Sequence, residues 1–322
     1  MRQQCIFACV ENFKRVLAAP GSSCLRDPRE RKGIVVEEFS PHAILPPVED
    51  DELQRVFRWL QNKDLASLLT VAVDDAVKYV LDGSRTGRFD LNSDEVDSDE
   101  RSAVGTNLQY RIINALDLLK ERPLDTVIDG VPVELKATVR NNWMIPTEGQ
   151  CEVCLLSEVD TKNMRHRALL MRTHRAWLNK PNKDKKRTIG AGAIRTYSLT
   201  VLDWTPLPPE PLKLLTSDQL AIVFAPRVGQ TERLTSLFGF LPDIVFPRSS
   251  IETVCSGKKD PIRRARQAKP KVLDRHGFIV LCGAWREDLE TAAERGYDIS
   301  NNAWISLSPE KFKTSFPSEF LF

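Results

Sequence analysis

Three charged side chains, Asp125, Glu134 and Lys136, have a spacing that could place them on one face of a β-hairpin. Asp129-Gly130 lies between two short apolar runs, and Asp-Gly between β-branched runs is a strong signal for a type I′ turn. If these two residues form the loop, Asp125 lies opposite Glu134 across the hairpin. Lys136 then projects from the same face, two residues further on. The register therefore predicts a cluster of two carboxylates and one ammonium.

Two neighbouring carboxylates repel each other unless a cation lies between them. Hard divalent ions, Mg²⁺ above all, are held by such carboxylates together with water and phosphate oxygens. A lysine beside the ion can position the water that attacks phosphorus and offset developing negative charge. Asp125 followed by Glu134-Leu135-Lys136 resembles the PD-(D/E)xK nuclease motif. An acid-x-Lys pattern on a strand also occurs as ordinary solvated surface, but the alignment of the acids across the turn favours a nuclease.

The composition is that of a globular protein with an uneven charge distribution. The 322 residues predict two domains. With 42% apolar and 28% charged residues, the composition is that of a soluble globular protein with enough apolar side chains for hydrophobic cores. The net charge of +2 conceals basic blocks: residues 162–187 carry ten Lys or Arg against one acid, and residues 258–275 carry eight against two. Such blocks bind phosphate backbones or are solvated surface, and charge alone leaves both readings open.

The cysteines and the apolar runs indicate the cellular compartment of the protein. Seven cysteines indicate no disulfide framework and fit a reducing cytoplasm. Cys151 and Cys154 form a CxxC pattern, but zinc requires four ligands and no second pair has matching spacing, so we expect both in strands or core. No apolar run approaches the roughly 20 residues of a membrane span. We therefore expect a cytoplasmic protein without membrane association.

The elements that must position the cluster follow from hydrophobic periodicity. Gln109 falls on an expected helix just before the hairpin. The pattern predicts a mixed α/β domain, helices followed by a sheet that carries the acidic hairpin, over residues 51–203. Residues 1–50 are expected to be a poorly ordered extension. The expected helices cover residues 53–60, 68–80 and 104–120, and the expected further strands 151–158, 168–173 and 194–202.

A second domain is predicted over residues 212–322. The segment 204–211, WTPLPPEP, holds four prolines, which cannot continue a helix or a strand. We therefore expect a stiff, extended linker between the two domains. Helices are expected over residues 231–241 and 249–254. A third begins at Asp260, which is a favoured N-cap because Pro261 follows at the first helical position. An apolar strand at residues 277–282 comes next.

This order of elements predicts a winged helix-turn-helix: a short helix, a Gly-containing turn, a basic helix and a strand pair. The basic helix carries Arg263, Arg264 and Arg266 near its start, where the second helix of such a motif meets DNA in the major groove. A helical interaction domain with a solvated basic face is the alternative.

With both halves considered, the chain resembles the NaeI-type restriction endonucleases from about residue 51 to residue 307. Several motifs occur in the right order, which makes the likeness far more specific than the charged triad alone. They are Asp82–Arg88 (DGSRTGR), Gly105-Thr106, the hairpin 125–136, Trp143–Pro146 with Glu148, Gly229-Gln230 and Leu237-Phe238.

The resemblance implies a Mg²⁺-dependent type II restriction enzyme that cuts double-stranded DNA at a specific sequence. Its fold would be a restriction-endonuclease-like nuclease core followed by a winged-helix domain. Carried over to this chain, Asp125 and Glu134 would hold the metal and Lys136 would serve the attacking water. The family also implies a homodimer and a second DNA site that acts as activator, and a restriction enzyme would work beside a cognate DNA methyltransferase.

Further positions complete the expected site and leave alternatives open. Arg85 and Arg88, in the basic loop 84–89, are expected to contact DNA. Gln109 stands where the family has a glutamate, so it can serve the catalytic site through its carbonyl but adds no charge. That leaves the number of bound metals open. Two other functions remain: a mismatch-repair-type nickase built on the same core, and a non-catalytic DNA-binding regulator with a decayed nuclease half.

Overall fold

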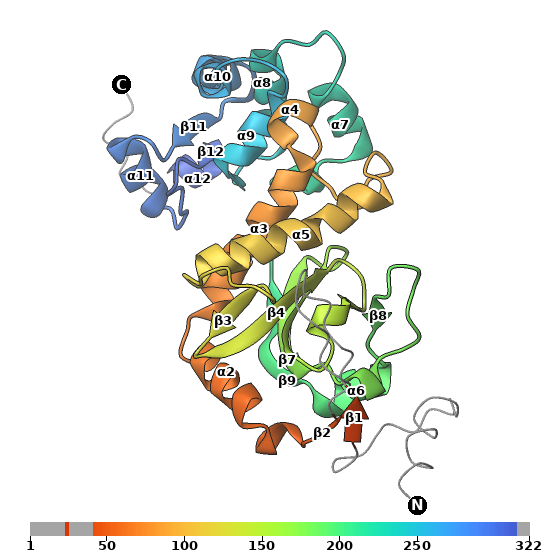
Figure 1. Ribbon diagram of the computed structural model, residues 1–322. Helices are drawn as coiled ribbons and strands as arrows, with labels where there is room; N and C mark the ends of the chain where they lie inside the picture. The colour runs from red at the N-terminus through yellow and green to blue at the C-terminus, as the bar shows by residue number, and fades with distance from the viewer. Residues whose placement is uncertain (1–22, 26–40, 314–322) are drawn as a thin grey trace, which may run out of the picture. The chain divides into compact units, whose positions relative to one another are not determined.

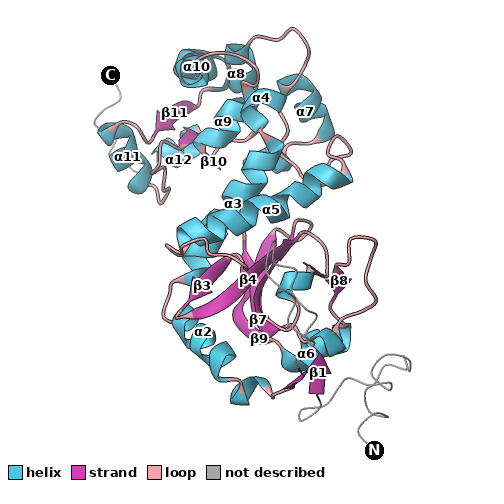
Figure 2. Cartoon of the chain, in the orientation of Figure 1, coloured by secondary structure: helices cyan, strands magenta, loops and turns pink. Residues whose placement is uncertain are grey.

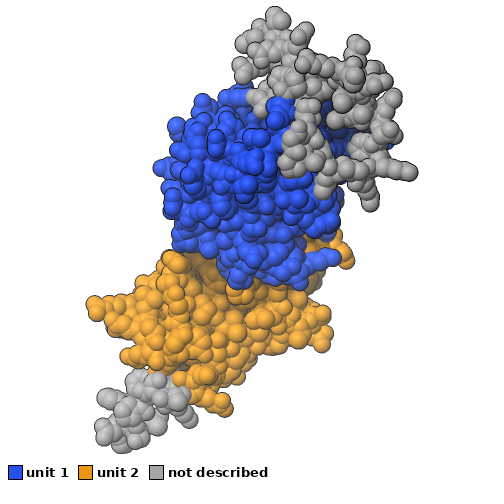
Figure 3. Space-filling view, turned by 90° about the horizontal axis from the view of Figure 1, so that it is seen from below, with its two compact units in different colours: residues 1–80, 97–208 blue, residues 81–96, 209–322 orange. Residues whose placement is uncertain are grey.

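The computed structural model describes residues 23–25 and 41–313 (Figure 1). Most of the expected extension 1–50 therefore lies outside the described residues. The chain divides into two compact units, coloured separately in Figure 3: unit 1 is residues 1–80 and 97–208, and unit 2 is residues 81–96 and 209–322. Residues 81–96, which the sequence analysis placed within 51–203, thus group with the C-terminal half of the chain.

Unit 1 is built on a five-stranded sheet with the strand order β3-β4-β6-β7-β9. β4 and β6 run parallel, and the other neighbouring strands are antiparallel. Helices and this mixed sheet (Figure 2) confirm the expected mixed α/β class. The strands are β3 (Thr126–Ile128), β4 (Val131–Thr138), β6 (Val153–Asp160), β7 (Arg165–Arg172) and β9 (Leu199–Pro206).

The β3–β4 hairpin has the register that the sequence predicted. Ile128 pairs with Val131, and Thr126 pairs with Val133. Asp129 and Gly130 have φ angles of 49° and 74°. Both are positive, as a type I′ turn requires at its two central positions. The short loop thus fixes which side chains of β4 share a face with the residues that precede β3.

Three helices pack around this sheet: α2 (Asp51–Gln61), α3 (Leu65–Leu81) and α5 (Ser98–Ala115). α5 begins six residues before the expected start at residue 104, because Asp97 and Glu100 form a capping box at its first turn. It also ends five residues before residue 120. α5 packs on β4, and a Cβ added at Gly105 would lie only 2.8 Å from the carbonyl oxygen of Ala137. Glycine therefore permits the approach that carries Gln109 to β4.

Two expectations for the end of unit 1 are wrong. The expected strand 194–202 is divided, since α6 (Ala191–Tyr197) precedes β9. β9 also continues into the proline-rich segment as far as Pro206, which pairs with Arg165. This is possible because β9 is an edge strand, where a residue without an N–H need not break a ladder bond on its open side. A short helix, η4 (Pro211–Leu214), follows.

Small elements complete unit 1 around a second core. Ile44, in the segment expected to be loose, is fully buried and packs with Trp143 and Trp177. Residues 41–49 are therefore part of the folded unit. The small elements are β1 (Ser23–Leu25), β2 (Pro41–Ala43), η1 (Pro47–Glu49), β5 (Met144–Ile145), η2 (Thr147–Gly149), η3 (Arg175–Trp177) and β8 (Arg187–Thr188).

Unit 2 combines helices with a three-stranded antiparallel sheet, β10-β12-β11. The helices expected over 231–241 and 249–254 are present within one residue of their predicted bounds, and the Asp260 side chain caps α10 by accepting from Arg263 N at 3.1 Å. Residues 83–86 form one helical turn instead of the expected loop. The elements are α4 (Gly83–Thr86), α7 (Ser217–Val223), α8 (Gln230–Phe240), β10 (Val245–Phe246), α9 (Arg248–Val254), α10 (Pro261–His276), β11 (Ile279–Cys282), α11 (Arg286–Ala293), β12 (Trp304–Leu307) and α12 (Pro309–Lys313).

Across the described residues, no helix combines the length and the apolar character that crossing a bilayer requires.

Candidate active site

Asp125, Glu134 and Lys136 meet at the β3–β4 hairpin. The Lys136 Nζ atom lies 2.5 Å from Glu134 Oε1 and 3.6 Å from Asp125 Oδ2. One ammonium therefore contacts both carboxylates. The hairpin register produces this arrangement, since Glu134 and Lys136 are two residues apart on β4 and Asp125 directly precedes β3.

The backbone of β4 holds the Asp125 side chain in place. Its Oδ2 atom accepts a hydrogen bond of 2.9 Å from the backbone N–H of Leu135. The same oxygen is the one that faces the Lys136 ammonium. The carboxylate is thus fixed by a strand N–H on one side and by a cation on the other, which restricts its rotamer freedom.

Glu134 is buried in an environment that disfavours its charge. Its exposed fraction is 3%. Burial raises its pKa above the ordinary value of 4.5, Lys136 opposes the rise, and the nearby charges of Asp125 and Glu148 add to it. The net pKa shift is upward, so the single ammonium does not fully compensate the buried negative charge.

Lys136 remains a cation in this setting. Burial by itself lowers the pKa of its ammonium, but the charge of Glu134 and the hydrogen bond to it outweigh that effect, with Asp125 contributing, so its pKa lies above 10.5. The side chain therefore offers hydrogen-bond donors and positive charge, and cannot act as a base while Glu134 is ionised beside it.

Gln109 reaches the site through the backbone between the two charged residues of β4. Its Nε2 donates to the carbonyl oxygen of Leu135 at 2.5 Å, and Lys136 Nζ donates to the same oxygen at 3.0 Å. The sequence placed Gln109 beside the hairpin, and it lies there. Its contact is with a backbone carbonyl, which requires a donor, and not with a carboxylate.

The donor set suits a hard divalent cation. The Lys136 ammonium already occupies the position in which a positive charge balances both carboxylates. Carboxylate oxygens are the ligands that Mg²⁺ prefers. The neighbouring thiol does not compete: Cys154 pairs with Glu134 in the sheet, and burial raises the pKa of this thiol to about 12. The raised pKa adds to the free-energy cost of forming a thiolate at Cys154, so the two carboxylates are the preferred ligands here.

Glu148 is a further acid near the cluster, and the sequence analysis assigned it no role in the site. It belongs to η2, and its charge contributes to the raised pKa of Glu134. The neighbouring Gly149 lies so close that an added Cβ would be 3.1 Å from Glu134 Cγ. The sequence signal was the motif Trp143–Pro146 followed by Glu148, whose role was not resolved by its spacing.

The five expected DNA-contacting arginines all lie in unit 2 and are not part of this cluster. On α10, Arg263 and Arg266 are exposed, whereas Arg264 is half-buried and donates to Gln267 Oε1 at 2.9 Å.

The other two arginines are Arg85, within α4, and Arg88, two residues after it. Arg85 has a side chain that is 82% exposed, and it forms an ion pair of 2.8 Å with Asp82. Arg88 is half-buried and donates to the carbonyl oxygen of Glu95 at 3.3 Å. Arg85 is therefore the more accessible of the two for a phosphate.

Comparison with known proteins gives one family. The family model described as "Restriction endonuclease NaeI" matches residues 54–303. The matched range includes Gln109, the hairpin cluster and α10. A search of curated proteins gives no match.

Proposed function

Because the chain belongs to the NaeI restriction endonuclease family, and is therefore a DNA-binding, type II site-specific deoxyribonuclease, we propose that Asp125, Glu134 and Lys136 form its active site. The observation that carries this proposal is the contact of one ammonium with both carboxylates. The mixed sheet of unit 1 is consistent with a restriction-endonuclease-like core. We assign unit 1 as the nuclease domain on these grounds.

Restriction endonucleases typically use divalent metal ions, and we propose Mg²⁺, held by Asp125 and Glu134. When bound, such an ion stabilises the charge that develops on the phosphate and makes water a better nucleophile. Two oxygen donors from acids, one of them buried, fit this hard cation. Glu148 is near enough to Glu134 to affect its pKa, and it adds to the negative field that attracts the ion.

The chain's own residues then orient the reaction. The Lys136 ammonium donates hydrogen bonds to the attacking water or to a phosphate oxygen and offsets negative charge in the transition state. Gln109 acts through the backbone, because its hydrogen bond to the Leu135 carbonyl ties α5 to the strand segment that carries both charged residues. We assign it as a positioning residue for this strand.

Unit 2 is proposed to bind DNA in the manner of a winged helix-turn-helix. α9 and α10 are consecutive helices packed on each other, and an antiparallel pair, β11 and β12, follows. Arg263 and Arg266 are exposed on the first turns of α10, where a recognition helix meets bases and phosphates. Arg85 and Arg88 are proposed as further contacts. A homodimer, activation through a second DNA site and a partner methyltransferase belong to the same proposal.

Plasmid cleavage tests the assignment. The purified protein is incubated with supercoiled plasmid in Mg²⁺ or in EDTA. Linear DNA in Mg²⁺ alone is expected. Nicked circles as the end product would indicate the repair-type nickase, and binding without cleavage in either condition would indicate the regulator.

Two matched variants locate the site. Glu134→Ala is expected to abolish cleavage while DNA binding stays close to that of the wild type, because one remaining carboxylate cannot hold Mg²⁺ against its hydration shell and phosphate contacts lie elsewhere. Glu158→Ala is the control, since this buried acid of β6 pairs with Arg167 and not with the cluster. Substantial Mg²⁺-dependent cutting by Glu134→Ala would refute the assigned active site.

A further inference from the structure

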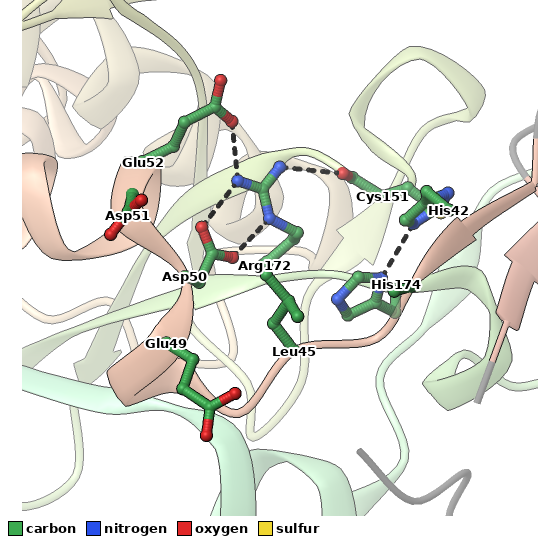
Figure 4. A pocket seen from close by; sticks show the side chains of 10 residues that line it. His42, Leu45, Glu49, Asp50, Asp51, Glu52, Cys151, Arg172 and His174 are labelled. Atoms are coloured by element: carbon green, nitrogen blue, oxygen red, sulfur yellow. Dashed lines mark hydrogen bonds and ion pairs between the residues drawn. The ribbon is translucent and has the colours of Figure 1, made fainter. Parts of the chain in front are cut away.

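A second cluster of possible metal ligands lies in unit 1. The ligand atoms of His42, Cys151 and His174 all lie within 4.8 Å of one another. The Nε2 atom of His42 and the Nδ1 atom of His174 are 3.0 Å apart. Figure 4 shows the three residues together at one side of a pocket with a volume of about 380 Å³.

The three residues come from segments that are far apart in the sequence. His42 belongs to β2, Cys151 lies two residues before β6, and His174 lies two residues after β7. The backbone joins the last two, since the N–H of Cys151 donates to the carbonyl oxygen of Thr173 at 2.8 Å. Cys151 and His174 lie next to strands of the five-stranded sheet, whereas His42 comes from β2. A bound metal would therefore fasten β2 to the five-stranded sheet.

Cys151 has a strained backbone conformation. Its φ angle is +65°, in the left-handed region that side chains other than glycine rarely adopt. Such strain persists where the surrounding structure holds it, and it is frequent at functional sites. Cys151 is completely buried, and His174 is 1% exposed. A buried thiol on a strained backbone, beside two imidazoles, is unusual for a residue that serves only core packing.

The chemistry of the three donors points to zinc. Thiolate and imidazole are borderline-soft ligands that favour Zn²⁺ over Mg²⁺. Tetrahedral zinc, with Zn–N distances of about 2.0–2.1 Å and Zn–S of about 2.3 Å, places its ligand atoms roughly 3.3–3.6 Å apart. The observed separations need only small side-chain adjustments to reach this range.

The charged residues that line the pocket favour a cation over phosphate. Its lining includes four consecutive acids, residues 49–52, against the guanidinium of Arg172. Arg172 is already paired with Asp50 at 2.6 Å and with Glu52 at 2.7 Å. The remaining field is negative, so it repels DNA and supports a positive ion. This separates the cluster in function from the DNA-cleaving site.

We propose that His42, Cys151 and His174 bind one Zn²⁺, with water or a small ligand from the pocket in the fourth position. Binding releases the thiol proton of Cys151 to solvent, and zinc takes its place on the sulfur. The ion ties residues 41–49 to the sheet of unit 1. The CxxC pattern is thus misleading in sequence: Cys151 finds its partners in two distant histidines, and Cys154 belongs to the surroundings of Glu134.

Cobalt substitution of the full-length protein tests the site. The chain, without an affinity tag, is stripped with EDTA and titrated with Co²⁺ in excess Mg²⁺, which occupies the hard-acid site. We expect one Co²⁺ per chain, with visible bands of a tetrahedral ion and a near-ultraviolet thiolate charge-transfer band, and displacement of both by Zn²⁺. Zinc should also raise the melting temperature of the stripped protein.

Three variants test whether Cys151 and His42, and not Cys154, bind the metal. Cys151→Ser is expected to lose the thiolate band. His42→Gln, on a partly exposed residue, is expected to weaken Co²⁺ binding by more than about 100-fold, since even outer-shell partners account for about 10–100-fold. Cys154→Ser is the matched control and should bind as the wild type does. If Cys151→Ser does not fold, His42→Gln carries the test by itself. The proposal is overturned if the wild type shows no thiolate band, if His42→Gln binds as tightly as the wild type, or if Cys154→Ser loses the metal.

Discussion

Glu134→Gln should abolish cleavage and at the same time stabilise the metal-free protein at neutral pH. The buried carboxyl has a raised pKa, so the folded state holds its proton more tightly than the unfolded chain does. Between the ordinary pKa of 4.5 and the raised folded value, folded molecules therefore bind more protons, and stability falls as the pH rises. The amide is a neutral isostere of the protonated acid and removes this loss.

The size of the effect follows from the slope of this linkage. With one proton of difference, the free energy of unfolding of the wild type falls by about 1.4 kcal/mol per pH unit across that window. The variant should match the wild type near pH 4 and exceed it increasingly up to the folded pKa, after which the difference stays constant. Because Glu134 is only 3% exposed, solvent screening reduces the effect little.

Urea denaturation in EDTA at a series of pH values from 4 to 7.5 measures the difference. A repeat in Mg²⁺ supplies the second arm, since an ion bound only by folded wild type adds RT ln(1 + [L]/Kd), about 2.7 kcal/mol at 100 times Kd. The wild type should gain stability from Mg²⁺ and the variant should gain little. A variant that is less stable than the wild type at pH 7 in EDTA, or whose advantage does not grow with pH, would refute the argument from burial.

Three further changes test α5 of unit 1 and α10 of unit 2. Gln109→Glu should cost about 1–3 kcal/mol of stability in EDTA, because the Leu135 carbonyl loses a donor and faces a carboxylate. In Mg²⁺ it should retain or increase cleavage, because the added carboxylate places negative charge beside the metal and this offsets the lost hydrogen bond to β4. Urea melts and plasmid assays check both, and loss of cleavage with the fold intact would contradict the second expectation. Gly105→Ala should lower the free energy of unfolding by about 1–3 kcal/mol, because the added Cβ would lie 2.8 Å from the Ala137 carbonyl oxygen and displace α5 from β4. An unchanged urea midpoint would contradict this expectation. Arg263→Ala in the full-length protein should flatten the plot of log affinity against log salt by about 0.9, the contribution of one phosphate contact; fluorescence anisotropy at several salt concentrations measures it, and an unchanged slope with unchanged sequence preference would remove Arg263 from the interface.

Local signals in the sequence were enough to predict the hairpin. A type I′ turn fixes the pairing register over the next few residues, so the sides taken by Asp125, Glu134 and Lys136 follow by counting. The same holds for α10, whose start is set by Asp260 and Pro261 within the chain segment itself. These features depend on sequence neighbours alone, which is why they needed no knowledge of the packing.

Features that depend on distant segments could not be predicted in this way. The burial of Glu134 arises from neighbours on β4, β6 and η2, and no pattern in β4 indicates it. β9 extends to Pro206 because it is an edge strand, a property of the whole sheet. His42 lies beside Cys151 and His174 through contacts across more than a hundred residues. The spacing of these residues in the sequence does not indicate that their side chains lie close together.

The glutamine at position 109 has a physical reason in this fold. The family resemblance implies a glutamate at this position. In this chain the Gln109 side chain faces the carbonyl oxygen of Leu135, which accepts from Gln109 Nε2 and from Lys136 Nζ. An ionised glutamate has no proton to give to that carbonyl and would add a further negative charge close to Asp125 and Glu134. The charge of Glu134 is already only partly compensated, as its raised pKa shows. Glutamine therefore lowers the electrostatic cost of the metal-free site and fixes β4 by a hydrogen bond. In the proposed active site, it leaves the binding of the cation to two carboxylates.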